Sequence, residues 1–343
     1  INKELLRQKA LQLGYDQDPQ AVGARASLTA YHAGMALWND VIGEPANTIS
    51  EEELQAFYDK MGTSRSCQFV ICNFEDDAEK ARDLARTGVD WDEIVEKFHD
   101  GSPAPNGRYT IKVPFGQYSP SFEDEIFETP IGEVTDPIQT SYGFWVLRVM
   151  DEKVGDKPDL ETAKAQILDV TRNRKMGRAR NEFKEWMREE HKLQIDEDVL
   201  WICYQGIPEG GLMDPETNEP RAKDTLEPLD VPLKELDRIF YTYELDGELK
   251  EHTLGDYKGH FDNMSVFQRP KRSDMLGGLR EHIIGELERG FVNEQARKRG
   301  FDQDPEVLKE VEGKVEEVMV TKLYGDVVTF DERVTAEDVD RFY

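Results

Sequence analysis

Cysteine is scarce in this chain of 343 residues, which contains only Cys67, Cys72 and Cys203. An odd number of cysteines cannot pair completely within one chain, and the spacing of these three matches no zinc-binding pattern. Cys67 and Cys72 lie five positions apart on an expected strand, so their side chains face opposite sides of the sheet. We therefore expect neither a disulfide framework nor a cysteine-based metal site.

Positive charge is also in short supply. The chain has 43 Lys and Arg residues against 71 Asp and Glu residues, which gives a formal net charge of −28. A surface of this sign repels nucleic-acid phosphates and anionic lipid headgroups, so we expect no nucleic-acid partner and no membrane-surface binding. Solubility explains the excess of negative charge most simply. The alternative is a surface that favours basic or aggregation-prone clients.

Long apolar runs are missing as well. No segment approaches the ~20 apolar residues that a membrane-spanning helix requires. The chain starts at Ile1 inside a helical pattern and shows no charged, apolar, small-residue leader, so we interpret it as a processed piece of a longer product. With 38% hydrophobic residues it still has enough apolar material for two or three cores, which predicts a multidomain protein.

Recognisable catalytic and metal-binding patterns are absent. The six histidines are scattered and show no metal-ligand spacing, so we predict no metal and no cofactor. The chain has no phosphate loop, nucleophile elbow or Ser-His-Asp order, and the Asp-Gln-Asp pairs lack the glycine turn and bidentate glutamate of a calcium loop. The glycine pair Gly277-Gly278 lacks phosphate-loop spacing, and we expect it at a helix junction.

The chain does contain an internal repeat. Residues 5–19 return as 291–305, and residues 49–58 return as 334–343. In both copies a glycine suited to a left-handed conformation ends one helix and an Asp-Pro pair starts the next: Gly14 with Asp18-Pro19, and Gly300 with Asp304-Pro305. Ser50 and Thr335 begin capping boxes for a further helix. The repeat predicts a duplicated helical hairpin followed by a short helix.

The remaining segments complete an α+β architecture. Asp159 caps a long helix whose apolar positions recur every three or four residues. The turn Asp246-Gly247 indicates a β-hairpin. We expect five segments: a helical segment at 1–64 (repeat copy one), an α/β domain at 65–152, the long helix at 153–200 packing on the first segment, an irregular connection at 201–235, and a hairpin with helices at 236–343 (repeat copy two).

Several landmarks between Cys67 and Asp151 occur in the order of a known family. Residues 89–94 match its "G-x-D-F" helix start, 116–127 its "G-Q-M-x-x-x-F-E-x-A-x-F" run, 131–138 its "G-E-V-S-x-P-V" turn, and 141–149 its closing "x-G-x-H-I-I-K-V" strand. This segment resembles a parvulin-type (PpiC, rotamase) peptidyl-prolyl isomerase domain. With its helical flanks, the chain is similar to the extracytoplasmic SurA and PrsA chaperones, in which such flanks join into one chaperone domain. The resemblance covers nearly the whole chain apart from about residues 201–235.

The resemblance also assigns site residues. Phe122 falls on the family's proline-pocket phenylalanine, and Tyr118 replaces its methionine or leucine. The catalytic positions depart from the pattern. Gln68, or Phe69 in a register shifted by one, replaces the family's first histidine, and Trp145 replaces the second. Gly101 replaces the acidic or cysteine residue, and residues 106–110 replace the "G-G-D-L-G" signature. We expect Phe122, Tyr118 and Trp145 to line a peptide-binding pocket. The alternative is that Phe122 and Trp145 only fill a core, as we expect for Phe127.

These departures bear on catalysis. Prolyl rotation faces a barrier of ~18–20 kcal/mol, which the family's site lowers without a covalent step. An indole in place of an imidazole removes an acceptor and adds bulk, although an aromatic pocket can still bury an apolar or prolyl side chain. We therefore expect isomerase activity to be weak or absent.

Three functions remain open. The first is an ATP-independent chaperone, extracytoplasmic and periplasmic by resemblance, that holds unfolded secreted or outer-membrane polypeptides. The second is an active peptidyl-prolyl isomerase, and the third is a dedicated assembly subunit. Because the second repeat copy lacks a long companion helix, we expect residues 291–343 to pack against 1–58 within the chain or to exchange between protomers as a homodimer.

Overall fold

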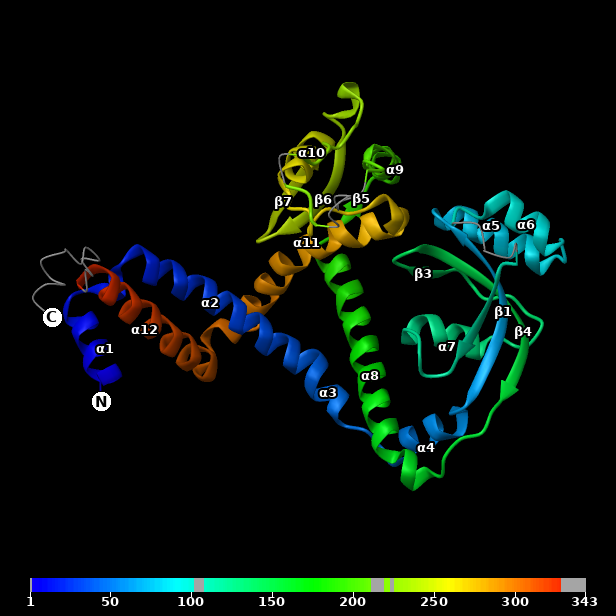
Figure 1. Cartoon of the computed structure of the whole chain (residues 1–343), viewed down its shortest axis with the longest axis horizontal. Helices are drawn as coiled ribbons and strands as arrows, with labels where there is room; N and C mark the ends of the chain where they lie inside the picture. The colour runs from blue at the N-terminus through cyan, green and yellow to red at the C-terminus, as the bar shows by residue number, and fades with distance from the viewer. Residues whose placement is uncertain (1, 102–107, 211–218, 223–224, 328–343) are drawn as a thin grey trace, which may run out of the picture. The chain divides into compact units, whose positions relative to one another are not determined.

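Two units make up the structure, which is a computed structural model describing residues 2–101, 108–210, 219–222 and 225–327 (Figure 1). The first unit comprises Ile1–Asp40 and Val292–Tyr343, and the second comprises Val41–Phe291. No helix in the described ranges has the length and apolarity that crossing a bilayer demands.

The first unit is helical and contains the helical hairpins of the two repeat copies, whereas residues 49–58 of copy one belong to the second unit. It is formed by α1 (Asn2–Gln12), α2 (Pro19–Trp38), the end of α11 (Met275–Lys298) and α12 (Pro305–Val327), with the 3-10 turns Tyr15–Gln17 and Phe301–Gln303 between helices. Gly14 and Gly300 have φ angles of 79° and 81°, as the repeat predicts. In each copy the aspartate before the proline caps the next helix, at 2.8 Å from Oδ1 of Asp18 or Asp304 to a main-chain nitrogen.

The two copies pack against each other within the chain. Helix α12 lies on α1 and α2 and buries a stripe with one residue in every four: Val307, Val311, Val315, Met319 and Leu323. Small residues of α2, among them Ala21 and Ala33, form the buried counterpart. Ion pairs such as Arg7–Glu316 (3.0 Å) flank this contact. Of the two expected arrangements, the structure shows the intrachain one, and the expected third helix at 334–343 lies outside the described residues.

A four-stranded antiparallel sheet forms the centre of the second unit, in the order β2-β1-β4-β3. Its strands are β1 (Thr63–Cys72), β2 (Thr110–Pro114), β3 (Ile138–Thr140) and β4 (Gly143–Val154). Helices α5 (Glu75–Arg86) and α6 (Trp91–Phe98) cover one face, and α7 (Pro120–Glu128) covers the other. Strands β1 and β4 extend slightly beyond the expected limits of 65–152, because Lys153 and Val154 pair with Ser64 and Thr63 instead of belonging to the long-helix segment.

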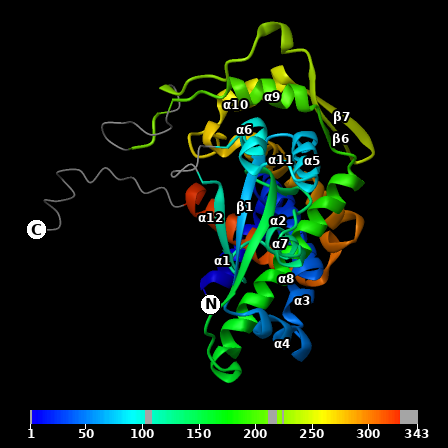
Figure 2. The same cartoon turned by 90° about the vertical axis from the view of Figure 1, so that its right-hand side faces the viewer.

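Helix α8 (Leu160–Glu190) packs on α3 (Glu44–Asn47) and α4 (Glu51–Lys60), as expected. Leu54, Ala163 and Ile167 form the core of this contact. The capping box predicted at Ser50 is present, with Glu53 N donating to Ser50 Oγ at 3.1 Å. Helix α7 lies between the sheet and α8 (Figure 1, Figure 2).

The rest of the second unit is a small α/β module. Its sheet has the order β5-β6-β7. The elements are β5 (Gln194–Ile195), α9 (Glu197–Gly206), β6 (Ile239–Leu245), β7 (Glu248–Thr253), α10 (Leu254–Asn263) and the start of α11, with 3-10 turns at Leu233–Glu235 and Arg272–Asp274. Outside this module, a π-helical turn at Asn39–Gly43 spans the sequence boundary between the two units. Asp246 and Gly247 have φ angles of 52° and 77°, as the predicted two-residue hairpin turn requires.

The segment 201–235 differs from the irregular connection that we expected. Trp201–Gly206 are the last turns of α9, and Leu229 and Val231 are buried in the core of the module. The Gly, Pro and acidic composition gave no sign of this burial, because the few apolar residues show no periodicity in sequence. In the structure they are covered by α10 and α11, which come later in the chain.

Candidate peptide-binding site

A cavity of about 650 Å³ opens between the four-stranded sheet, α7 and α8 in the second unit. Tyr118, Phe122 and Trp145 all line it, so the structure brings together the three residues that the sequence analysis assigned to a pocket. The β3 edge of the sheet supplies a second wall, and α8 supplies a third through Asn181, Lys184, Glu185 and Arg188. The volume is within the ~300–1,000 Å³ range of ligand sites.

The aromatic wall is a continuous set of ring contacts. Phe122 lies 5.6 Å from Tyr118 and 5.4 Å from Trp145 between ring centroids, and it meets Trp145 edge to face. Phe122 is 5% exposed and also packs in the core beneath α7, whereas Tyr118 is 39% exposed at the rim. Phe122 thus fills a core and forms a wall at once. The indole Nε1 of Trp145 is buried and has no hydrogen-bond partner within the described residues.

Strand alternation separates Phe69 from Gln68. Val70 and Cys72 of β1 pack with α5 and α6, while Cys67 and Phe69 pack with α7. Phe69 lies 4.9 Å from Trp145 between ring centroids, on the cavity face. Gln68 lies on the opposite face, where its Oε1 is buried without a hydrogen-bond partner in the described residues. Of the two registers left open by the sequence, Phe69 is the one adjacent to the site.

His99 is a neighbour of the site that sequence reasoning missed. Its Nδ1 accepts a hydrogen bond from Ile71 N at 3.1 Å, and its ring lies 6.0 Å from Phe69 and 4.6 Å from Tyr109. A Cβ atom at Gly101 would lie 2.8 Å from His99 Nε2. The imidazole therefore occupies the space that a side chain at position 101 needs. The available signal was proximity in sequence, because His99 stands two residues before a position already singled out.

Glu123 fixes the loop that carries Tyr118. Its carboxylate is fully buried and accepts hydrogen bonds from the main-chain nitrogens of Gly116 (2.7 Å), Gln117 (3.0 Å) and Tyr118 (3.1 Å). Gly116 has a φ angle of 90°, and a Cβ there would lie 2.9 Å from the Phe57 ring of α4. The loop is thus held from both sides, and its position sets the position of the Tyr118 ring.

Arg174 of α8 completes this arrangement. Its Nη1 donates to Glu123 at 2.6 Å, its Nη2 donates to Asp124 at 2.7 Å, and its guanidinium lies 4.9 Å from the centroid of Phe115. The Arg174 side chain is 9% exposed and that of Glu123 is 0% exposed. A buried ion pair therefore joins α8, which follows the sheet in sequence, to the loop at the cavity rim.

Helix α11 approaches the other end of the cavity. A Cβ at Gly277 would lie 2.7 Å from Gly143 N and 2.9 Å from Ser141 O, in the turn between β3 and β4. The glycine at this position permits helix and turn to touch. The pair Gly277-Gly278 thus lies inside the first turns of α11, against a strand turn, and not at the helix junction that we expected. Glu281 of the same helix lines the cavity and pairs with Arg188 at 3.0 Å.

Charge in the cavity is predominantly negative. The acidic residues Glu125, Asp136, Glu185 and Glu281 line it, whereas Lys184 and Arg188 are the cations of the described lining. Both cations are neutralised by carboxylates, Lys184 by Glu288 at 3.2 Å and Arg188 by Glu281. In the parts of the chain that are described, no three His, Cys, Asp or Glu side chains converge as metal ligands would. The arrangement suits an apolar or prolyl side chain next to basic neighbours.

Comparison with known proteins identifies the family that the sheet domain of the second unit resembles. Residues 49–165 match the family described as the PPIC-type PPIASE domain, so this part of the chain is a parvulin-type PPIase domain. Among curated relatives, the foldase protein PrsA of Oceanobacillus iheyensis is 28% identical over 119 residues, covering 33% of this chain and 40% of that protein. The chaperone SurA of Pseudomonas savastanoi pv. phaseolicola is 34% identical over 113 residues, covering 33% of this chain and 26% of that protein.

Among solved structures, foldase protein PrsA from Streptococcus pneumoniae aligns with 51% of this chain and 70% of its own, at 15% identity and a TM-score of 0.31. The chain spans less than half the length of the two curated relatives named above.

Proposed function

We propose that this chain is an ATP-independent chaperone that holds unfolded polypeptide segments at the aromatic cavity of its PPIC-type domain. The observation that carries the proposal is the make-up of that cavity. Tyr118, Phe122 and Trp145 offer apolar contact area, and no histidine occurs among its described lining residues. Aromatic walls of this kind bind apolar side chains whatever the surrounding sequence, which suits a protein with many clients.

The relatives support the same direction. The matched proteins carry the names foldase PrsA and chaperone SurA. The family match at residues 49–165 covers the sheet and α7, which build much of the cavity wall. By this resemblance we place the protein outside the cytoplasm, in the periplasm, with unfolded secreted or outer-membrane polypeptides as clients. The acidic lining of the cavity further favours client segments with Lys or Arg beside an apolar residue. A homodimer through the helical segments stays a prediction that light scattering would test.

Suppression of aggregation tests the chaperone proposal. We expect the full chain to reduce light scattering from denatured, reduced lysozyme, a basic client, without added ATP. Tyr118→Ala should weaken peptide binding about three- to tenfold, because it removes an aromatic ring from the rim while leaving the core intact. Tyr324→Ala is the matched control, since Tyr324 is 50% exposed on α12 and does not line the cavity. No suppression at several-fold molar excess of the chain would count decisively against the proposal.

An active isomerase is the second candidate, and the match of residues 49–165 to the PPIASE family favours it. The indole of Trp145 stands where the resemblance expects a histidine, and its Nε1 is buried without a partner in the described residues. We expect residual activity at most, because the indole cannot accept a proton or a hydrogen bond through that nitrogen. NMR exchange spectroscopy on a Xaa-Pro peptide measures it directly. If the cis–trans exchange rate of the peptide rises strongly with protein concentration, and rises much less with the Tyr118→Ala variant, the chain is an enzyme.

A further inference from the structure

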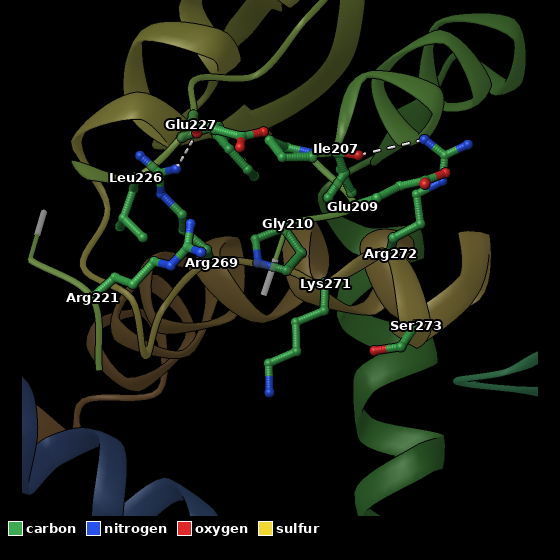
Figure 3. Close-up of a pocket in the computed structure, with 13 residues that line it drawn as sticks. Ile207, Glu209, Gly210, Arg221, Leu226, Glu227, Arg269, Lys271, Arg272 and Ser273 are labelled. Atoms are coloured by element: carbon green, nitrogen blue, oxygen red, sulfur yellow. Dashed lines mark hydrogen bonds between the residues drawn. The ribbon is translucent and has the colours of Figure 1, made fainter. Parts of the chain in front are cut away.

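A second and smaller cavity lies in the α/β module of the second unit, where the residues after α9 meet the segment between α10 and α11 (Figure 3). Its volume is about 170 Å³, and its described lining has no residue in common with the peptide-binding cavity. Ile207, Leu226 and Phe261 form its apolar wall. Because one water occupies ~30 Å³, the space corresponds to about five or six waters and suits a small organic group.

Cations gather at this cavity in a chain that is otherwise strongly acidic. Arg221, Arg269, Lys271 and Arg272 line it, together with the carboxylates of Glu209 and Glu227. Within the described residues none of the four cations forms an ion pair with a carboxylate. The carboxylate of Glu227 lies by Gly210, where a Cβ would be 3.2 Å from its Oε1. The cavity therefore carries an excess of positive charge that its own acidic residues leave uncompensated.

Arg269 is the fixed part of this charge. The residue is 6% exposed, its guanidinium donates to the main-chain oxygens of Glu227 and Asp262, and it lies 4.8 Å from the centroid of Phe261. Its Nε is buried without a hydrogen-bond partner in the described part of the chain. Burial lowers the pKa of Arg269, which is the sign of a guanidinium whose charge is poorly balanced. Carbonyl oxygens position the group but supply no full negative charge.

Two further guanidinium groups complete the geometry. In Figure 3 the side chain of Arg221 points toward Arg269, while Lys271 extends away from both. Arg272 is fixed on the other side of the cavity, where it donates to the main-chain oxygens of Gln205 and Ile207 and lies over the Tyr204 ring. Guanidinium groups gathered at one cavity repel one another, and an anion bound among them converts this repulsion into attraction.

From this arrangement we propose that the cavity binds a single carboxylate group carrying a small apolar substituent. The planar guanidinium fork matches a carboxylate, and the apolar wall favours an organic acid over an inorganic anion. The volume admits one such group, and the net charge of −28 on the whole chain disfavours any polyanion that would extend beyond the cavity. The carboxylate can come from a free small acid or from the C-terminal end of a polypeptide.

Calorimetric titration of the full chain with N-acetyl-leucine tests the proposal. We expect one site per chain, binding that weakens with added salt, and no binding of the neutral analogue N-acetyl-leucinamide. Arg221→Gln should weaken binding about tenfold or more, since a charge-assisted hydrogen bond contributes ~1.5–3 kcal/mol. Lys234→Gln is the matched control, because Lys234 lies in the same module with its side chain 81% exposed and outside the cavity.

Two comparisons complete the experiment. A short peptide ending in leucine, with a free or an amidated C-terminus, distinguishes the sources: binding of the free-acid peptide points to a chain end, and binding of N-acetyl-leucine alone points to a small acid. Inorganic phosphate is titrated in parallel. Equal affinity for acid and amide, equal affinity for phosphate, or an Arg221→Gln affinity equal to that of Lys234→Gln would each overturn the proposal.

Discussion

Breaking the ion pair between Arg174 and Glu123 should release the loop that carries Tyr118. Arg174→Met keeps the length and most of the packing volume of the side chain but leaves the Glu123 carboxylate buried without its cation. Removal of one partner from a buried pair costs ~3–5 kcal/mol. Glu123 retains three main-chain N–H donors, so we expect a loss near the lower end, about 3 kcal/mol.

Urea unfolding and amide hydrogen exchange measure the two parts of this effect. Unfolding of the PPIC-type domain gives the free energy, and exchange at the amides of Gly116, Gln117 and Tyr118 reports the loop directly. Because 1.4 kcal/mol corresponds to a factor of ten, protection at these amides should fall about a hundredfold. Peptide binding at the cavity should weaken as well, since the Tyr118 ring loses its fixed position.

Arg178→Met is the matched control, and Glu123→Gln combined with Arg174→Met is the compensating variant. Arg178 also pairs with Asp124, but its side chain is 50% exposed, so its removal should cost at most about 1 kcal/mol. The double variant leaves no uncompensated buried charge and should recover part of the loss. If Arg174→Met costs no more than Arg178→Met, or leaves the three amides fully protected, the coupling of α8 to the loop is refuted.

Two further predictions concern buried positions. Gly101→Ala and Gly277→Ala should each destabilise the fold by ~1–3 kcal/mol, because a Cβ would meet His99 at 2.8 Å or the main chain of Gly143 at 2.7 Å. Thermal unfolding measures this loss. Gly285→Ala is the control and should be neutral or stabilising, because its Cβ would have open space around it. Burial raises the pKa of Cys67 to about 11 and that of Cys72 to about 12, so both thiols should resist Ellman's reagent at pH 8 until the chain unfolds. Since unfolded thiols ionise near pH 9 while the folded ones stay protonated, the unfolding free energy should fall as the pH rises above about 9, and a rise there would contradict the assignment.

Local signals predicted much of the fold. The left-handed Gly14 and Gly300, the capping box at Ser50 and the hairpin turn at Asp246-Gly247 all depend on residues within a few positions of one another. Such features leave a clear mark in sequence because their energetics are local. The aromatic wall was also predictable, since Tyr118 and Phe122 lie four positions apart in one recognisable segment and Trp145 falls in a recognisable strand.

Other features depend on partners that are distant in sequence. To choose between Gln68 and Phe69, one must know which residues of β1 face α7 and the cavity. A register shift of one position moves every side chain of a strand to the opposite face of the sheet. His99 reaches the site only because the end of α6 returns to β1. The pairing of Glu123 with Arg174 joins positions 51 residues apart, and no local pattern marks either as a partner of the other.

The arrangement of the first unit has a consequence for biosynthesis. Helix α2 finds its partner α12 only when residues 305–327 have been made, after nearly the whole of the intervening chain. During translation the alanine-rich side of α2 therefore stays uncovered, while the sheet domain can already complete its own hydrogen bonds. Folding should therefore begin in the central sheet domain, and the helices at the two ends of the described chain should pack together last.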